Sequence, residues 1–168
     1  MPEQETIQRA RKDEAEGKSP STQAGEFVRE EMHHIREGKH GAQSPQQAVA
    51  IGLSKARRAG VKLPPPKGAR TSSRTKRQAE RDLRKGRRRG NSTNSKTSRT
   101  RSRAILGALK KEGRSAASHR ALSNFAHSAA SRRGKQNRRS AAQKAVRTKG
   151  HAGLQRAARK AARTRSSR

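Results

Sequence analysis

The chain has 168 residues, with 44 Lys and Arg against 12 Asp and Glu, and a formal net charge of +32. Nearly all of this charge lies in residues 62–168, which hold 34 basic side chains and three acidic ones. Because like charges oppose compaction, such a segment requires a polyanionic partner, and the abundant polyanions of a cell are DNA and RNA. The absence of Cys excludes a disulfide framework and a thiolate metal site.

The N-terminal sequence does not have the features of an export signal. Residues 1–18 hold five acidic side chains and no apolar stretch, unlike a secretory signal or a mitochondrial presequence. Nowhere does an apolar run approach the roughly 20 residues of a membrane span. We therefore expect a cytoplasmic protein of the nucleoid that has no membrane partner.

Residues 1–20 are expected to form a polar, flexible leader. A short frayed helix from about Thr6 to Glu16 fits the sequence, but Ile7 is the only large apolar side chain that it can bury. Burial of one side chain cannot repay the entropy of ordering the whole segment, so we expect no stable structure there.

Residues 21–66 predict a folded unit, an αα-hairpin. Its first helix carries large apolar side chains at helical spacing, and these are Phe27, Val28, Met32 and Ile35. Gly38 or Gly41 can end that helix in a left-handed cap. About 40 residues make a unit that is marginally stable on its own.

The second helix of the hairpin is expected from about Pro45 to Ala59. Ser44 is the expected N-cap, with Pro45 at the first helical position and Gln47 placed to complete a capping box. Gly60 ends the helix, and a run of three prolines follows. The face expected to meet the first helix carries small and apolar residues, namely Ala48, Val49, Gly52, Leu53 and Ala56.

Residues 67–168 form a low-complexity polybasic segment, rich in Arg, Lys, Ser and Ala. Between 62 and 168 there are nine large apolar side chains, too few to offset roughly 1–2 kcal/mol of backbone entropy per residue. The expected fold is therefore mainly α, a small αα-hairpin followed by a long, largely disordered basic tail with transient helices. Helical patches are expected at 74–85, 101–112, 115–133, 139–148 and 154–164.

An internal repeat lies near the C-terminal end. Residues 139–149 align without gaps on residues 155–165, and a weaker third copy begins at Arg114. The repeat combines Ala, the strongest helix former, with Lys or Arg at many other positions. Like charges oppose such a helix in water, so we expect the helix to form upon phosphate binding. The alternative is that the repeat arose by chance, through drift of the sequence towards Ala and Arg.

A group of His and Glu residues between positions 30 and 40 raises the question of a metal site. Zinc requires three or four converging ligands. His33 and His34 are adjacent and point about 100° apart on a helix, and His40 falls in a turn. A solvated polar face, with Glu30 paired to His34 and Glu37 to His33, is the preferred interpretation, so no metal or other cofactor is expected.

No pattern typical of an enzyme is present. The chain has no Cys nucleophile, no Gly-x-Ser-x-Gly elbow, no paired carboxylates in an apolar setting and no glycine-rich phosphate loop after a strand. We therefore expect neither catalytic residues nor enzymatic activity.

Clusters of Arg and Lys predict a nucleic-acid interface. They are Arg87, Arg88, Arg89, Arg99, Arg101, Arg103, Arg132, Arg133, Arg138, Arg139, Lys144, Arg147, Arg156, Arg159, Lys160, Arg163 and Arg165. Such groups clamp phosphates without reading bases. With no Trp, no Tyr and two Phe, the chain lacks stacking platforms for single strands. Binding to a duplex backbone is therefore favoured over single-strand recognition, with structured RNA left open.

The segment EEMHHIREGKHGAQSPQQAVAIGLSKAR (residues 30–57) resembles a bacterial family of short, strongly basic proteins of unknown function. The resemblance implies that the hairpin is a unit and supplies no catalytic residues. In composition the tail looks like the Ala/Lys/Arg-rich tails of linker histones and bacterial histone-like proteins.

These patterns together predict a nucleoid-associated, histone-like protein that binds DNA largely independently of sequence. The hairpin would serve for protein docking or self-association. One alternative is an RNA-associated or ribosome-associated assembly factor. Another is an interaction protein whose hairpin binds a partner protein while the tail only localises it.

Overall fold

The computed structural model describes residues 2–67, 71–89 and 99–166, with Arg89, Arg99 and Arg101 described as backbone only. These ranges contain helices and irregular segments and no strand, so the prediction of a mainly α fold is confirmed. The chain divides into two compact units, Met1–Leu122 and Ser123–Arg168. No helix in the described part is long and apolar enough to cross a membrane.

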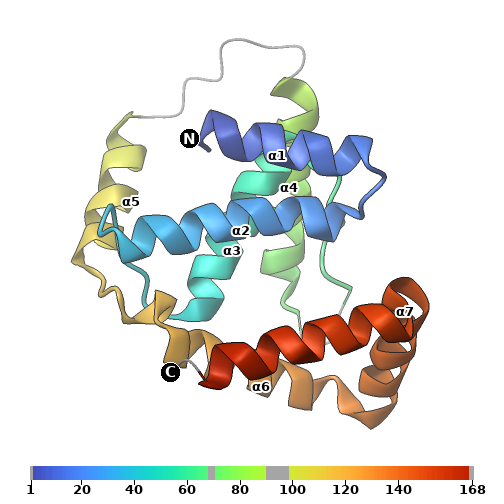
Figure 1. Cartoon of the computed structure of the whole chain (residues 1–168). Helices are drawn as coiled ribbons and strands as arrows, with labels where there is room; N and C mark the ends of the chain where they lie inside the picture. The colour runs from blue at the N-terminus through green and yellow to red at the C-terminus, as the bar shows by residue number, and fades with distance from the viewer. Residues whose placement is uncertain (1, 68–70, 90–98, 167–168) are drawn as a thin grey trace. The chain divides into compact units, whose positions relative to one another are not determined.

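In the first unit, α1 and α2 lie side by side while α3 and α4 cross behind them (Figure 1). The second unit holds the remainder of α6 and all of α7. The helices of the chain are α1 (Gln4–Ala15), α2 (Pro20–Arg36), α3 (Pro45–Ala59), α4 (Ser73–Arg89), α5 (Arg99–Lys111), the short 3₁₀ helix η1 (Ser115–Ala117), α6 (His119–Arg132) and α7 (Gly134–Ser166).

Helices α2 and α3 form the helix pair expected between residues 21 and 66, and they bury two apolar clusters. The first comprises Phe27, Ala10, Ala24, Ala56 and Val61. The second comprises Met32, Ile35, Ala42, Ala48, Ala116 and Ala117. Both clusters contain residues from outside the hairpin, so its apolar surface is completed by its own chain.

The ends of α3 follow the expected capping chemistry. The Ser44 hydroxyl accepts a hydrogen bond from the Gln47 amide at 3.2 Å. The Gln47 side chain in turn accepts from the Gln43 amide at 2.8 Å, one residue before the usual capping-box position. At the other end Gly60 adopts a φ of 107°, a left-handed conformation that favours glycine.

The N-terminal segment is a packed helix in the structure, where a flexible leader was expected. Helix α1 buries Thr6, Ala10 and Asp13, and Ile7 packs against the first cluster. Ion pairs hold it further, since Arg9 Nε lies 2.9 Å from Glu26 Oε2 and Lys18 Nζ lies 2.7 Å from Asp13 Oδ1. The predicted burial was too small because Ala and Thr were not counted.

Helix α4 belongs to the basic segment but docks on α3. The Ser54 hydroxyl donates to Asp82 at 2.6 Å, and Asp82 is 2% exposed. A Cβ added at Gly86 would lie 2.1 Å from the Arg57 carbonyl oxygen, so the two backbones are in direct contact. This α4 contact extends the folded unit well beyond residue 66.

A second contact joins the basic segment to the loop between α2 and α3. The amide of Gly41 donates to the Leu109 carbonyl at 2.8 Å, and the amide of Ala42 donates to the Gly113 carbonyl at 3.1 Å. A Cβ at Gly41 would lie 1.9 Å from the Glu112 carbonyl oxygen. The loop therefore lies directly against the backbone of residues 109–113.

The expected disorder of the tail was wrong for the described residues, which are mostly helical from α4 to α7. The prediction counted large apolar side chains, whereas the structure buries Ala79, Ala116 and Ala117. Helices α6 and α7 bury no residue. Their helical state therefore depends on local hydrogen bonds and on the helix propensity of Ala, Arg and Lys. The positions of the expected helical patches agree well with α4 to α7.

Candidate nucleic-acid interface

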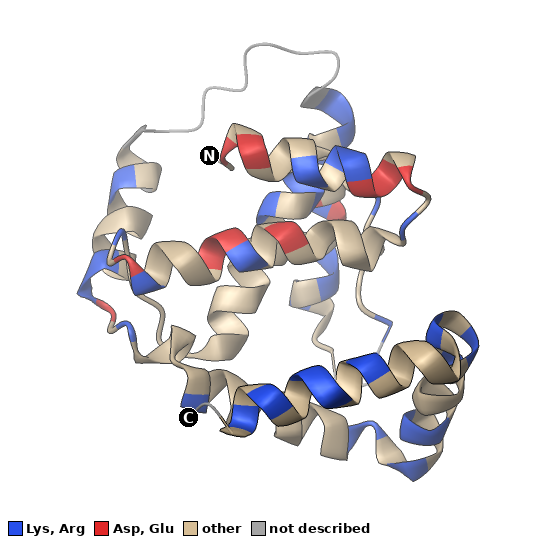
Figure 2. Ribbon diagram, in the orientation of Figure 1, with Lys and Arg blue, Asp and Glu red and all other residues tan. Residues whose placement is uncertain are grey.

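Basic and acidic side chains separate along the chain (Figure 2). Acidic residues concentrate on α1 and α2, whereas α6 and α7 carry none. Residues 123–168 hold fourteen Lys and Arg and no Asp or Glu. No compensating carboxylate exists within this unit, so its positive charge is available to an external anion.

The structure places the predicted binding residues on four helices. Arg87 and Arg88 lie on α4, Arg103 on α5, and Arg132 at the end of α6, with Arg133 following it. Lys144 and the others from Arg138 onward lie on α7. The side chains of Arg89, Arg99 and Arg101 lie outside the described part of the structure. Every predicted site residue whose side chain is described is exposed, and none forms an ion pair with a described residue.

Helix α7 consists of two arms separated by Gly150. This residue has φ 62° and ψ 172°, a conformation outside the helical region that essentially only glycine adopts. Each arm carries one copy of the internal repeat, residues 139–149 before the break and residues 155–165 after it. The sequence repeat is thus a structural repeat of two basic helical arms.

The two copies also make the same local hydrogen bond. Thr148 donates from its hydroxyl to the Lys144 carbonyl at 2.9 Å, and Thr164 donates to the Lys160 carbonyl at 2.9 Å. The weak third copy is different, because its Ala116 and Ala117 lie in η1 and are buried against α2 and α3. The third copy therefore uses its Ala residues for packing, although its Arg114 is exposed.

The second arm places most of its cations on one face. At about 100° per residue, four of its five basic residues fall within an arc of roughly 100°, while Arg165 lies on the opposite side among Ala and Leu. These four are Arg156, Arg159, Lys160 and Arg163. In the first arm the matching positions are Ser140, Gln143, Lys144 and Arg147, so that only half of them are basic. The second arm therefore carries the denser cationic face at these positions.

A different polar group lies inside the first unit, where the sequence predicted a solvated helix face. Glu30 is 4% exposed and Glu31 is 0% exposed, so that prediction was wrong for these carboxylates. Lys55 Nζ lies 2.6 Å from Glu31 Oε2 and 3.3 Å from Glu30 Oε1. Glu30 does lie near His34, at 4.0 Å, but Glu37 pairs with Lys39 in place of His33.

Sequence reasoning missed Lys55 as a partner of these carboxylates. A signal was present, because Lys55 comes three residues after Gly52 and four before Ala59 and so shares their side of α3. A cation on the small-residue face of a helix requires an anion on the facing helix. Glu30 and Glu31 of α2 are the anions that it meets.

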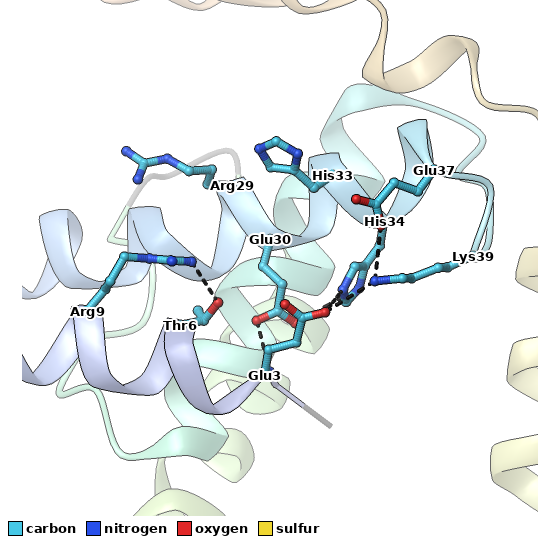
Figure 3. Close-up of a pocket in the computed structure, with 9 residues that line it drawn as sticks. All are labelled: Glu3, Thr6, Arg9, Arg29, Glu30, His33, His34, Glu37 and Lys39. Carbon is cyan, nitrogen blue, oxygen red and sulfur yellow. Dashed lines mark hydrogen bonds and ion pairs between the residues drawn. The ribbon is translucent and has the colours of Figure 1, made fainter.

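A surface hollow of about 230 Å³ borders this group, between α1 and α2 (Figure 3). Glu3 closes one side, with its Oε1 atom 2.8 Å from His34 Nε2 and 3.2 Å from Lys39 Nζ. The hydrogen bond with His34, and next that from Lys39, lower the pKa of Glu3 below its ordinary value. Both signs of charge line this hollow, so it has no clear preference for a phosphate.

Residues 19–67 match the model of a family of unknown function, DUF6496. The matched segment contains α2, α3 and the loop between them, and it ends before α4. The exposed basic arms of α7 lie outside the match. No curated protein and no solved structure matches the chain.

Proposed function

We propose that this protein binds nucleic acid, duplex DNA in the first place, through the basic arms of α7 and with little dependence on sequence. The observation that carries the proposal is that the α7 cations are exposed and form no ion pair with a described residue, in a unit whose sequence contains no Asp or Glu. Exposed guanidinium and ammonium groups gain free energy by releasing the counterions condensed on a phosphate backbone.

The side chains of α7 favour contact with the phosphate backbone of the duplex over readout of its bases. Arg and Lys contacts to phosphates position a protein on a duplex but carry no sequence information. The arc of the basic face on the second arm contains no Asn, Gln or aromatic group that could read or stack on a base, and Gln155 lies just outside it. The first unit would act as the folded body that carries these arms, in keeping with a nucleoid-associated, non-enzymatic role.

The polymer partner can be identified by competition. Full-length protein is titrated with a fluorescent 30-base-pair DNA of random sequence, and unlabelled random DNA and RNA duplexes of the same length compete. The proposal predicts that unlabelled DNA duplexes of two different random sequences compete equally, and that DNA competes at least as well as RNA. Preference for RNA would favour the RNA-associated or ribosome-associated alternative. A preference above about 1,000-fold for one DNA sequence would contradict sequence-independent binding.

A further inference from the structure

The buried polar group between α2 and the α2–α3 loop contains three side chains that converge. Glu31, His34 and His40 each place one ligand atom within 4.8 Å of the other two. Glu31 is fully buried, and the side chains of His34 and His40 are 12% and 10% exposed. Their rings meet edge to face, with centroids 6.1 Å apart and planes at 84°. Burial and convergence set this group apart from the exposed cations of α7.

The hydrogen bonds of His40 fix which nitrogen is free. His40 Nδ1 lies 3.1 Å from the Gly41 carbonyl oxygen, which can only accept, so Nδ1 carries a proton. In a neutral ring Nε2 then holds a lone pair, and it lies 3.1 Å from Glu31 Oε1. Two acceptors at this separation repel each other unless a cation lies between them.

The same argument applies to His34. Its Nε2 lies 2.8 Å from the Glu3 carboxylate, so Nε2 donates and Nδ1 keeps the lone pair. A carboxylate or carbonyl behind the ring is the arrangement that orients metal-ligating histidines in proteins. His34 has the Glu3 carboxylate and His40 has the Gly41 carbonyl in this role.

With both imidazoles neutral, the described charges of the interior leave one carboxylate without a cation. Glu30 and Glu31 bring two negative charges, and Lys55 supplies one positive charge to them. Neither oxygen of Glu31 receives a hydrogen bond of good geometry, although Lys55 lies close to Oε2. A buried carboxylate without hydrogen bonds destabilises the folded protein. Lys55 lies against Oε2, which leaves Oε1 on the side of His40.

We propose that Glu31, His34 and His40 form a binding site for a divalent transition-metal ion, with Zn²⁺ the best match. Two imidazoles and one carboxylate suit zinc and its neighbours in the transition series, whereas Mg²⁺ and Ca²⁺ require oxygen ligands. Zinc bonds of about 2.0–2.2 Å place ligand atoms roughly 3.4 Å apart. His40 Nε2 and Glu31 Oε1, now 3.1 Å apart, would therefore separate slightly, and any pair near the upper separation of 4.8 Å would close. The ion would join α2 to the loop that carries His40 and so stabilise the hairpin.

The site can be tested on the full-length chain after chelator treatment. With ¹⁵N-labelled protein, Zn²⁺ should shift the ring nitrogens of His34 and His40 while leaving the other four of the six histidines unchanged. Saturation is expected at about one ion per chain, with an increase in Tm, and Mg²⁺ should have no effect. If both His40 nitrogens are protonated at neutral pH and do not respond to Zn²⁺, a proton takes the place of the metal and the proposal is wrong.

Variants give a second readout. His40→Gln should abolish the Zn²⁺-dependent rise in Tm, whereas His33→Gln should retain it, because His33 is exposed and outside the group. Equal Zn²⁺ binding by both variants would show adventitious binding to surface histidines and would overturn the proposal. The ring-nitrogen measurement on the unmodified chain decides the matter even if His40→Gln fails to fold.

Discussion

Gly52 of α3 lies against the backbone of Val28 of α2 so closely that a Cβ added to Gly52 would be 2.8 Å from the Val28 Cα. Real Cβ atoms do not approach a backbone atom this closely. The absence of a side chain at Gly52 therefore sets the distance between the two hairpin helices. The same contact brings Lys55, one turn further along α3, within reach of the buried carboxylates of α2.

The first prediction concerns this helix contact. Gly52→Ala should lower the free energy of unfolding of the first unit by about 1–3 kcal/mol, because the added methyl group forces α2 and α3 apart. Gly25→Ala is the matched control: Gly25 lies within α2, has no atom within 4 Å of an added Cβ and has no positive φ. That control should be neutral or stabilising by up to about 1 kcal/mol. Urea unfolding followed by circular dichroism measures both, and equal effects would refute the close contact.

The second prediction concerns the docking of α4. Asp82→Ala removes the acceptor of the Ser54 hydrogen bond and should cost about 1–3 kcal/mol. Glu80→Ala, an exposed acid two residues earlier on the same helix, should change the unfolding free energy little. Both variants raise the net charge by one, so a difference in their urea midpoints reports the buried contact alone. Equal midpoints would mean that α4 does not dock through Asp82.

The third prediction concerns acid sensitivity. The folded state lowers the pKa of Glu3 through hydrogen bonds with His34 and Lys39. A lowered folded-state pKa stabilises the protein above the ordinary pKa of Glu, and this contribution is lost as pH falls through the lower, folded value. The difference in Tm between wild type and Glu3→Gln should therefore be largest near neutral pH and shrink towards pH 3. A difference independent of pH would contradict this link.

The hairpin was predictable because its signals are local. Ser44, Pro45 and Gln47 specify the start of α3, and Gly60 specifies its end, each through contacts within one turn. The contacts that bring α1, α4 and η1 onto the hairpin are not local. They depend mostly on small or polar residues, such as Ala10, Gly86 and the buried Asp82, and such residues produce no apolar periodicity that a sequence pattern can reveal.

The two candidate sites also differ in whether the sequence alone reveals them. The cations of α7 could be found because an excess of one charge is a property of composition. The group of Glu31, His34 and His40 could not be assembled by spacing along one helix, since His40 belongs to a loop. Its position depends on hydrogen bonds from Gly41 and Ala42 to the backbone near residue 110. That segment lies some 70 residues further along the chain.

The final prediction concerns the role of α7. Arg159 and Lys160 are adjacent on the basic face of the second arm, and the chain contains the same dipeptide as exposed Arg11 and Lys12 of α1. The surroundings of the two pairs differ, because α1 lies in a part of the chain where acidic and basic residues nearly balance. Replacing each pair by Gln removes the same two charges from the chain.

The most direct test is the salt dependence of binding to random duplex DNA by wild type and by these two double variants. The wild type should give a steep linear decrease of log K with log salt concentration. Arg159→Gln/Lys160→Gln should make the slope shallower by about 1.8, at 0.9 per phosphate contact, whereas Arg11→Gln/Lys12→Gln should leave it unchanged. A flat response of the wild type, or equal slopes for both variants, would contradict phosphate binding by α7.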